Sequence, residues 1–135
     1  MSSPEIRLFR LNRQAVMREL EEYAEKAVAE GALAVILIGS LARGNYTAYS
    51  DADIIIIVKE SPERPIDRIT RHLQPKASID IEPRVYTMGE IREMIRNKAR
   101  IIREIAEHGI LLKGDEGIIS EIKKRHHDRH CQASP

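Results

Sequence analysis

Two short motifs in the chain combine residue types that bind phosphate groups and metal ions. Gly39-Ser40 ends one apolar run, and Asp51-Ala52-Asp53 opens another after an interval of ten residues. Glycine lets the backbone approach a ligand closely, and the N–H groups that follow, with the Ser40 hydroxyl, could cradle phosphate oxygens. Arg43 either adds positive charge to this cradle or is an ordinary surface residue. The predicted nucleotide-binding residues are Gly39, Ser40, Arg43 and Ser50.

The two aspartates predict a metal site. Asp51 and Asp53 are two residues apart, so in a strand both carboxylates leave the same face. Like charges held this close repel each other unless a cation lies between them. Carboxylate oxygens suit Mg²⁺ or Mn²⁺, and such an ion can bind triphosphate oxygens and stabilise charge on a transferred group.

A third carboxylate on a neighbouring strand would complete a two-metal site and accept the proton of an attacking hydroxyl. Segment 79–86 alternates in polarity, which puts Asp80 and Glu82 together on its polar face. Either carboxylate could take this role. Pro83 cannot donate a ladder hydrogen bond, so this strand is expected at a sheet edge or broken there.

Hydrophobic periodicity predicts the elements that must hold these motifs. Continuous apolar runs are typical of strands buried on both faces, and apolar residues at helical spacing predict amphipathic helices. Thr87-Met88-Gly89-Glu90 reads as a capping box at the start of a long helix. The expected strands are 32–38, 51–58 and 79–86 with a short apolar piece at 110–113, and the expected helices are 11–30, 65–73, 88–109 and one from 115.

The gapped motif resembles the nucleotidyltransferase superfamily that includes DNA polymerase beta and kanamycin nucleotidyltransferase. That family's signature is Gly-Ser, about ten residues, then Asp-x-Asp, and the resemblance covers roughly residues 15–113. The short chain is similar to the minimal branch that is often paired with a helical HEPN protein. The resemblance implies an α/β (α+β) fold, in which a small mixed β-sheet has helices packed on one side. It implies one domain over 1–135, with a core of about 11–113 and a C-terminal helix and tail at 115–135.

The same resemblance implies a function. Such a protein would transfer a nucleoside monophosphate, most plausibly AMP from ATP, to a hydroxyl acceptor on a HEPN-type toxin, as an antitoxin does. Two Mg²⁺ ions (or Mn²⁺) would assist. By the family's spacing Glu82 is favoured as third carboxylate and metal ligand, and Asp80 follows by residue type. The alternative is a catalytically weak or inactive subunit that binds nucleotide or a partner. The predicted catalytic residues are Asp51, Asp53, Glu82 and Asp80, and the predicted metal ligands are Asp51, Asp53 and Glu82.

Composition narrows the range of partners. The net charge of +1 provides no overall field that would attract nucleic acid or a membrane, so direct nucleic-acid binding is not expected. The apolar runs are too short to span a bilayer, and the opening residues lack the pattern of a signal peptide. A single cysteine suits a reducing compartment. We therefore expect a cytoplasmic protein, for which a second copy of the chain is a further candidate partner.

Overall fold

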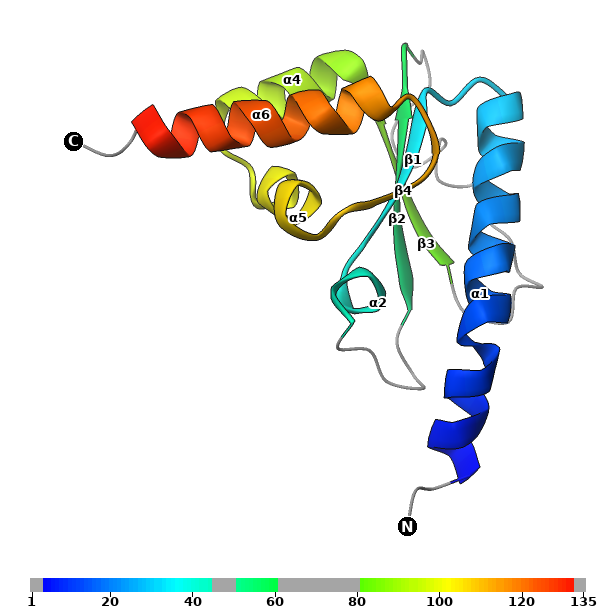
Figure 1. Ribbon diagram of the computed structural model, residues 1–135. Coiled ribbons are helices and arrows are strands. Elements are labelled where there is room, and N and C mark those ends of the chain that lie inside the picture. The colour runs from blue at the N-terminus through cyan, green and yellow to red at the C-terminus, as the bar shows by residue number, and fades with distance from the viewer. Residues whose placement is uncertain (1–3, 45–50, 61–80, 133–135) are drawn as a thin grey trace.

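A four-stranded mixed sheet forms the centre of the molecule (Figure 1). The computed structural model describes residues 4–44, 51–60 and 81–132, and the side chains of 14–44, 51–60 and 81–127. The strand order is β3-β2-β1-β4, in which β1 is antiparallel to β2 and β4, and β2 is parallel to β3. The strands are β1 (Ala34–Ile38), β2 (Ala52–Val58), β3 (Ile81–Thr87) and β4 (Ile110–Gly114).

Helices cover both faces of this sheet. The long helix α1 lies against one face, whereas α4, α5 and α6 lie on the other (Figure 1). The expected fold class is confirmed, but the expectation of helices on one side only is corrected. Both faces of β1 and β2 are apolar, so both must be covered. The helices are α1 (Pro4–Ala29), α2 (Ser40–Arg43), α4 (Met88–Arg96), α5 (Arg100–His108) and α6 (Glu116–Gln132).

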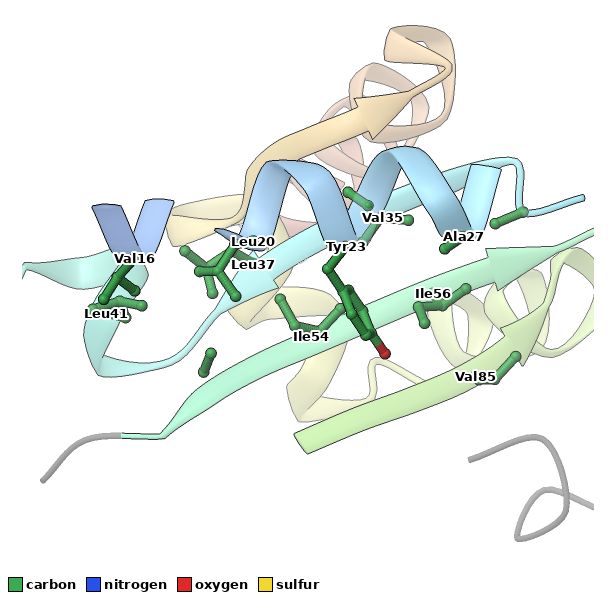
Figure 2. Packing of buried hydrophobic residues seen from close by; sticks show 13 residues of the cluster. Val16, Leu20, Tyr23, Ala27, Val35, Leu37, Leu41, Ile54, Ile56 and Val85 are labelled. Atoms are coloured by element: carbon green, nitrogen blue, oxygen red, sulfur yellow. The ribbon is translucent and has the colours of Figure 1, made fainter. Parts of the chain in front are cut away.

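The first half of the core lies between α1 and the sheet. Tyr23 of α1 lies across Ile54 and Ile56 and points towards the edge strand β3, where Val85 belongs to the same cluster (Figure 2). Leu20, fully buried, packs in this cluster as well. Burying a large aliphatic side chain contributes roughly 1.5–3 kcal/mol. This packing holds β1 and β2 firmly, and the two predicted motifs lie at the ends of these strands.

The second half of the core lies under α4, α5 and α6. Alternate residues of β1 and β2 meet the isoleucines of these helices, because successive strand side chains point to opposite faces. Ile105 of α5 is completely buried here, as is Ile91 of α4. The aliphatic residues of this cluster are Ala34, Ile36, Ile38, Ile55, Ile57, Ile91, Ile95, Ile102, Ile105, Ile118, Ile119 and Ile122.

Two of the predicted helices differ from the structure. The first begins at Pro4 rather than near residue 11, and proline is well tolerated in the first turn, where its missing N–H is not needed. The predicted helix over 88–109 is two helices, because Lys98 takes a left-handed conformation (φ 55°) between them. The change of direction keeps the buried faces of both α4 and α5 on the sheet. The capping box at Thr87 is confirmed, with reciprocal Thr87–Glu90 hydrogen bonds.

The remaining expectations are met in the described residues. Strand β3 lies at the edge of the sheet, as Pro83 predicts. The apolar piece at 110–113 is strand β4, and the last helix runs to Gln132. The expected helix at 65–73 and residues 79–80 of the expected strand lie outside the described residues. Among the described helices, none is both long and apolar enough to cross a membrane.

Candidate active site

A row of acidic side chains crosses the start of two neighbouring strands. Asp53 of β2 is in register with Glu82 of β3 on one side and with Ile38 of β1 on the other. Residues paired in this way point to the same face of the sheet. Asp53 alternates with Ile55, which packs under the helices, so the Asp53 and Glu82 carboxylates lie on the face that carries α4–α6. The predicted pairing of the second aspartate with a third carboxylate is therefore present in the backbone register.

Asp51 joins this row at the residue that precedes β2. Its side chain and that of Asp53 are half-buried, whereas Glu82 is exposed. The pKa of the Glu82 carboxyl is raised above its usual range by partial desolvation, and next by the negative charges and hydrogen-bonding oxygens of Asp51 and Asp53. Because Glu82 is exposed and loses little hydration, the charges of Asp51 and Asp53 are the more convincing physical cause of its raised pKa. Glu82 is thus close enough to both aspartates for their negative charges to act on it.

These oxygens fit a hard divalent cation by their chemistry. Like charges that raise the pKa of Glu82 favour a cation between them, and carboxylate oxygens are the ligands that Mg²⁺ prefers. In the part of the chain that the structure describes, no three His, Cys, Asp or Glu side chains form a ready coordination cluster. A Mg²⁺ site here would accordingly draw further ligands from water or from the phosphates of a nucleotide, as this ion commonly does.

Gly39 places the end of β1 directly against this acidic row. Its backbone has φ 83° and ψ −164°, a conformation that residues with a side chain rarely adopt. A β-carbon on residue 39 would overlap Oδ2 of Asp53 and lie 3.2 Å from its Cγ. Glycine is therefore required here for two reasons, the backbone conformation and the space that the Asp53 carboxylate occupies. The two motifs therefore lie side by side.

Ser40 begins the short helix α2, which turns the chain away from the sheet. Ser40 is half-buried, and the turn is closed by hydrogen bonds from Arg43 N to Gly39 O (3.0 Å) and from Gly44 N to Ser40 O (2.9 Å). Gly44 ends the helix with a left-handed conformation. Two of the predicted site residues, Ser50 and Asp80, lie outside the described residues.

Glu104 of α5 contacts both ends of this turn. Its Oε1 accepts a hydrogen bond from the Gly39 N–H at 3.2 Å and forms an ion pair with the Arg43 guanidinium. Sequence reasoning missed this residue, which is 65 positions from Gly39. One signal was available: Glu104 follows Ile101 by three residues at the border of the apolar stripe of α5, so part of its side chain faces the protein, where a carboxylate needs a partner.

A hollow of about 780 Å³ lies elsewhere on the molecule. Its walls come from the far ends of β2 and β3 and from the first turns of α4 and α6, with Lys59, Thr87, Arg92 and Asp115 among them. None of the residues that line it belongs to the acidic row or to the turn at Gly39. This hollow therefore lies at the opposite ends of these strands from the candidate active site.

Comparison with known families agrees with this arrangement. Residues 17–112 match the family described as nucleotidyltransferase domain, and that range contains both motifs, the edge strand and α5. The chain belongs to this family. The resemblance to nucleotidyltransferases is thereby confirmed, and with it the expectation of a nucleotidyltransferase. Residues 1–16 and 113–135 lie outside the matched range.

Two archaeal relatives are similar over part of the chain. Both come from Methanocaldococcus jannaschii, and each is described as a candidate protein adenylyltransferase. The first is 32% identical over 90 residues, which are 56% of this chain and 61% of that protein. The second is 36% identical over 80 residues, which are 56% of this chain and 74% of that protein. The match to the first relative thus spans less than two thirds of its length.

Solved structures share the fold of this nucleotidyltransferase. A candidate nucleotidyltransferase from Sulfolobus solfataricus aligns with a TM-score of 0.55 and 19% identity, over 82% of this chain and 87% of that one. A chain of a toxin–antitoxin complex with AMP-PNP aligns with a TM-score of 0.57 and 17% identity, over 84% and 90%. A chain of the complex between the tri-AMPylated Shewanella oneidensis HEPN toxin and its MNT antitoxin aligns with a TM-score of 0.51 and 12% identity, over 90% of both. At these identities the likeness concerns the fold.

Proposed function

We propose that this protein is a Mg²⁺-dependent nucleotidyltransferase that moves AMP from ATP to a hydroxyl group of an acceptor. The observation that carries the proposal is the register of Asp53 with Glu82, with Asp51 beside them, directly against the turn at Gly39. Carboxylates of a kind that binds metal ions therefore lie next to a turn that suits phosphate groups. Membership of the nucleotidyltransferase domain family supports the same reaction class.

Each part of the site has a proposed role. Gly39, Ser40 and Arg43 would hold the triphosphate, and Ser50 remains a further candidate. Asp51, Asp53 and Glu82 would hold two Mg²⁺ ions, for which Mn²⁺ could substitute. When bound, these ions would neutralise the charge on the phosphates of ATP.

In the proposed transfer, one bond to the α-phosphorus of ATP forms and another breaks. The acceptor oxygen forms a bond to the α-phosphorus of ATP, and the bond from that phosphorus to the oxygen bridging to the β-phosphorus breaks. Pyrophosphate leaves with the electron pair of the broken bond. The proton of the acceptor hydroxyl passes to Glu82 or Asp80. Glu82 is in register with Asp53, so its carboxylate lies beside the proposed metal ligands, where a base could take that proton.

The acceptor is proposed to be a hydroxyl on a protein. The support comes from the two relatives described as candidate protein adenylyltransferases, and from the fold shared with a chain of a complex that contains a tri-AMPylated HEPN toxin. A HEPN-type helical protein encoded beside this chain would be the partner, and this chain would act as its antitoxin. A second copy of this chain is the other candidate partner.

The proposal is tested by incubating the purified protein with α-labelled ATP, Mg²⁺ and the product of the neighbouring gene. We expect label on the partner, release of pyrophosphate, and loss of both in Asp51→Asn. Glu107→Gln on the outer side of α5 serves as the control and should label normally. If ATP binds but no label moves, the chain is a non-catalytic binding subunit. If neither binding nor transfer occurs with Mg²⁺ or Mn²⁺, the proposed function is wrong.

A further inference from the structure

One carboxylate oxygen joins the two ends of the turn that follows β1. Oε1 of Glu104 accepts the Gly39 N–H at 3.2 Å and also meets the guanidinium of Arg43. The Arg43 side chain is 35% exposed and that of Glu104 is 25% exposed, so the pair lies at the surface, with Glu104 the better covered partner. The contact matters for its geometry, because one oxygen meets both Gly39 and Arg43, and not for an unusual strength.

We propose that Glu104 is a positioning residue for the triphosphate, acting through Arg43 and Gly39. This inference rests on the proposed function, because it assumes that the turn binds the phosphates of ATP. Glu104 would fix the direction of the Arg43 side chain and the orientation of the Gly39 peptide before the nucleotide arrives. Preorganisation of this kind improves binding because less freedom is lost when the ligand binds.

The location of Glu104 suits this role. Helix α5 is anchored by Ile102 and Ile105, which are buried against the sheet, so the carboxylate that projects from it has a firm base. Arg43 is attached to a helix of only four residues and needs such an external support. A guanidinium has five N–H donors, and the contact with Glu104 involves its Nη1, so donors remain for phosphate oxygens.

The negative charge of Glu104 also needs Arg43 as its partner. Three other carboxylates, Asp51, Asp53 and Glu82, lie at the same end of the sheet, and Asp53 touches the position of Gly39 directly. An additional unpaired negative charge here would repel ATP. The ion pair with Arg43 neutralises that charge and keeps it on the α5 side of Gly39.

The opposite role would make Glu104 a competitor of the nucleotide. In that case its carboxylate would occupy the donors of the phosphate site and would have to leave when ATP binds. The two roles predict different effects of Glu104→Gln, which keeps an acceptor oxygen but removes the charge. A positioning residue tolerates this change, whereas removing a competitor tightens binding.

The test is a calorimetric titration of ATP with Mg²⁺ into the full chain and its variants, together with kcat and KM for labelled transfer. We expect Glu104→Ala to weaken ATP binding and raise KM about tenfold while kcat changes less, and Glu104→Gln to stay within about threefold of wild type. Arg43→Ala should weaken binding by a similar factor. The double variant Arg43→Ala/Glu104→Ala should bind no more weakly than Arg43→Ala alone, since the two residues act as a unit.

Glu107→Ala and Glu107→Gln are the matched controls, because Glu107 lies one turn further along α5 and pairs with Arg103 at 3.2 Å. Both controls should bind ATP like wild type, and thermal unfolding shows that every variant is folded. The inference is overturned if wild type binds ATP and both Glu104 variants bind equally well or more tightly, or if the Arg43 and Glu104 effects add. If wild type itself does not bind ATP, the proposed function is wrong and this inference with it.

Discussion

Gly39 and Asp53 lie so close that a β-carbon on residue 39 would overlap the Asp53 carboxylate. The two residues end one strand and begin the next along the chain, and β1 and β2 pair antiparallel, so the register brings them together. The turn proposed for phosphate and the aspartate proposed for metal are thus one structural unit. A change in the backbone of the first must displace the side chain of the second.

Gly39→Ala should therefore abolish ATP binding in the presence of Mg²⁺. The added methyl group both strains the backbone at φ 83° and pushes the Asp53 carboxylate out of its place. Gly44→Ala is the matched control, because Gly44 has nearly the same φ of 88° but, among the described residues, no atom within 4 Å of its would-be β-carbon. We expect the control to lose about 1–2 kcal/mol of stability and to retain binding. Equal binding by both variants, measured calorimetrically, would contradict this account.

Mg²⁺ alone should stabilise the folded protein. Asp51, Asp53 and Glu82 repel one another without a cation, as the raised pKa of Glu82 shows, and a bound ion removes that repulsion. At ten times its dissociation constant the ion would add about 1.4 kcal/mol of unfolding free energy, or several degrees in Tm. Asp53→Asn should lose most of this increase, while Glu107→Gln should keep it. The assay is thermal unfolding over a Mg²⁺ series, and an identical response of wild type and Asp53→Asn would refute the assignment of this ligand.

The metal-free protein should lose stability as the pH rises through the raised pKa of Glu82. From its ordinary value of 4.5 upwards, the folded protein still holds this proton whereas the unfolded chain has released it. The folded state therefore binds more protons in this interval, and the free energy of unfolding falls with increasing pH. Glu82→Gln lacks this group, so its advantage in Tm over wild type should grow from pH 4.5 upwards. A Tm difference that does not change with pH would show that the three carboxylates are not coupled.

The central strands and the two motifs were predictable because the signals are local. The apolar runs before Gly39 and after Asp53 have the length and the continuous apolar character typical of buried strands, and the spacing between Gly-Ser and Asp-x-Asp can be read directly from the sequence. Pro83 predicted that β3 lies at an edge or is broken there, and the structure shows the edge position. These features needed no knowledge of how distant segments pack.

The features that escaped prediction depend on tertiary contacts. The contact between Glu104 and Gly39 joins residues 65 positions apart, and only the packing of α5 on the sheet creates it. The break at Lys98 is another such case, since local helix propensity continues through residues 97–99 while the sheet requires α4 and α5 to change direction. Helices on both faces of the sheet were not predicted either, although the apolar runs indicated that β1 and β2 are buried on both faces.

Lys98→Gly should stabilise the protein. Lysine in the left-handed region at φ 55° carries a steric penalty of about 1–2 kcal/mol, which glycine does not. Part of this gain is offset by the greater freedom of glycine in the unfolded chain, so we expect a net gain of about 0.5–1 kcal/mol in urea unfolding. Ala106→Gly is the control, because residue 106 lies inside α5, where glycine costs about 0.5–1 kcal/mol relative to alanine. A loss of stability in Lys98→Gly would contradict the described conformation between α4 and α5.

The most direct test of the central claim is a calorimetric titration of ATP into wild type and Asp51→Asn, with and without Mg²⁺. We expect wild type to bind ATP only with Mg²⁺ and Asp51→Asn to lose this binding. The reason is that the carboxylates beside Gly39 would bind the Mg²⁺ ion, and the ion would bind the phosphates of ATP. Thermal unfolding of Asp51→Asn shows that the loss is not a loss of folding. Absence of ATP binding by folded wild type with Mg²⁺, or equal binding by Asp51→Asn, would contradict the claim that this acidic row is a metal–nucleotide site.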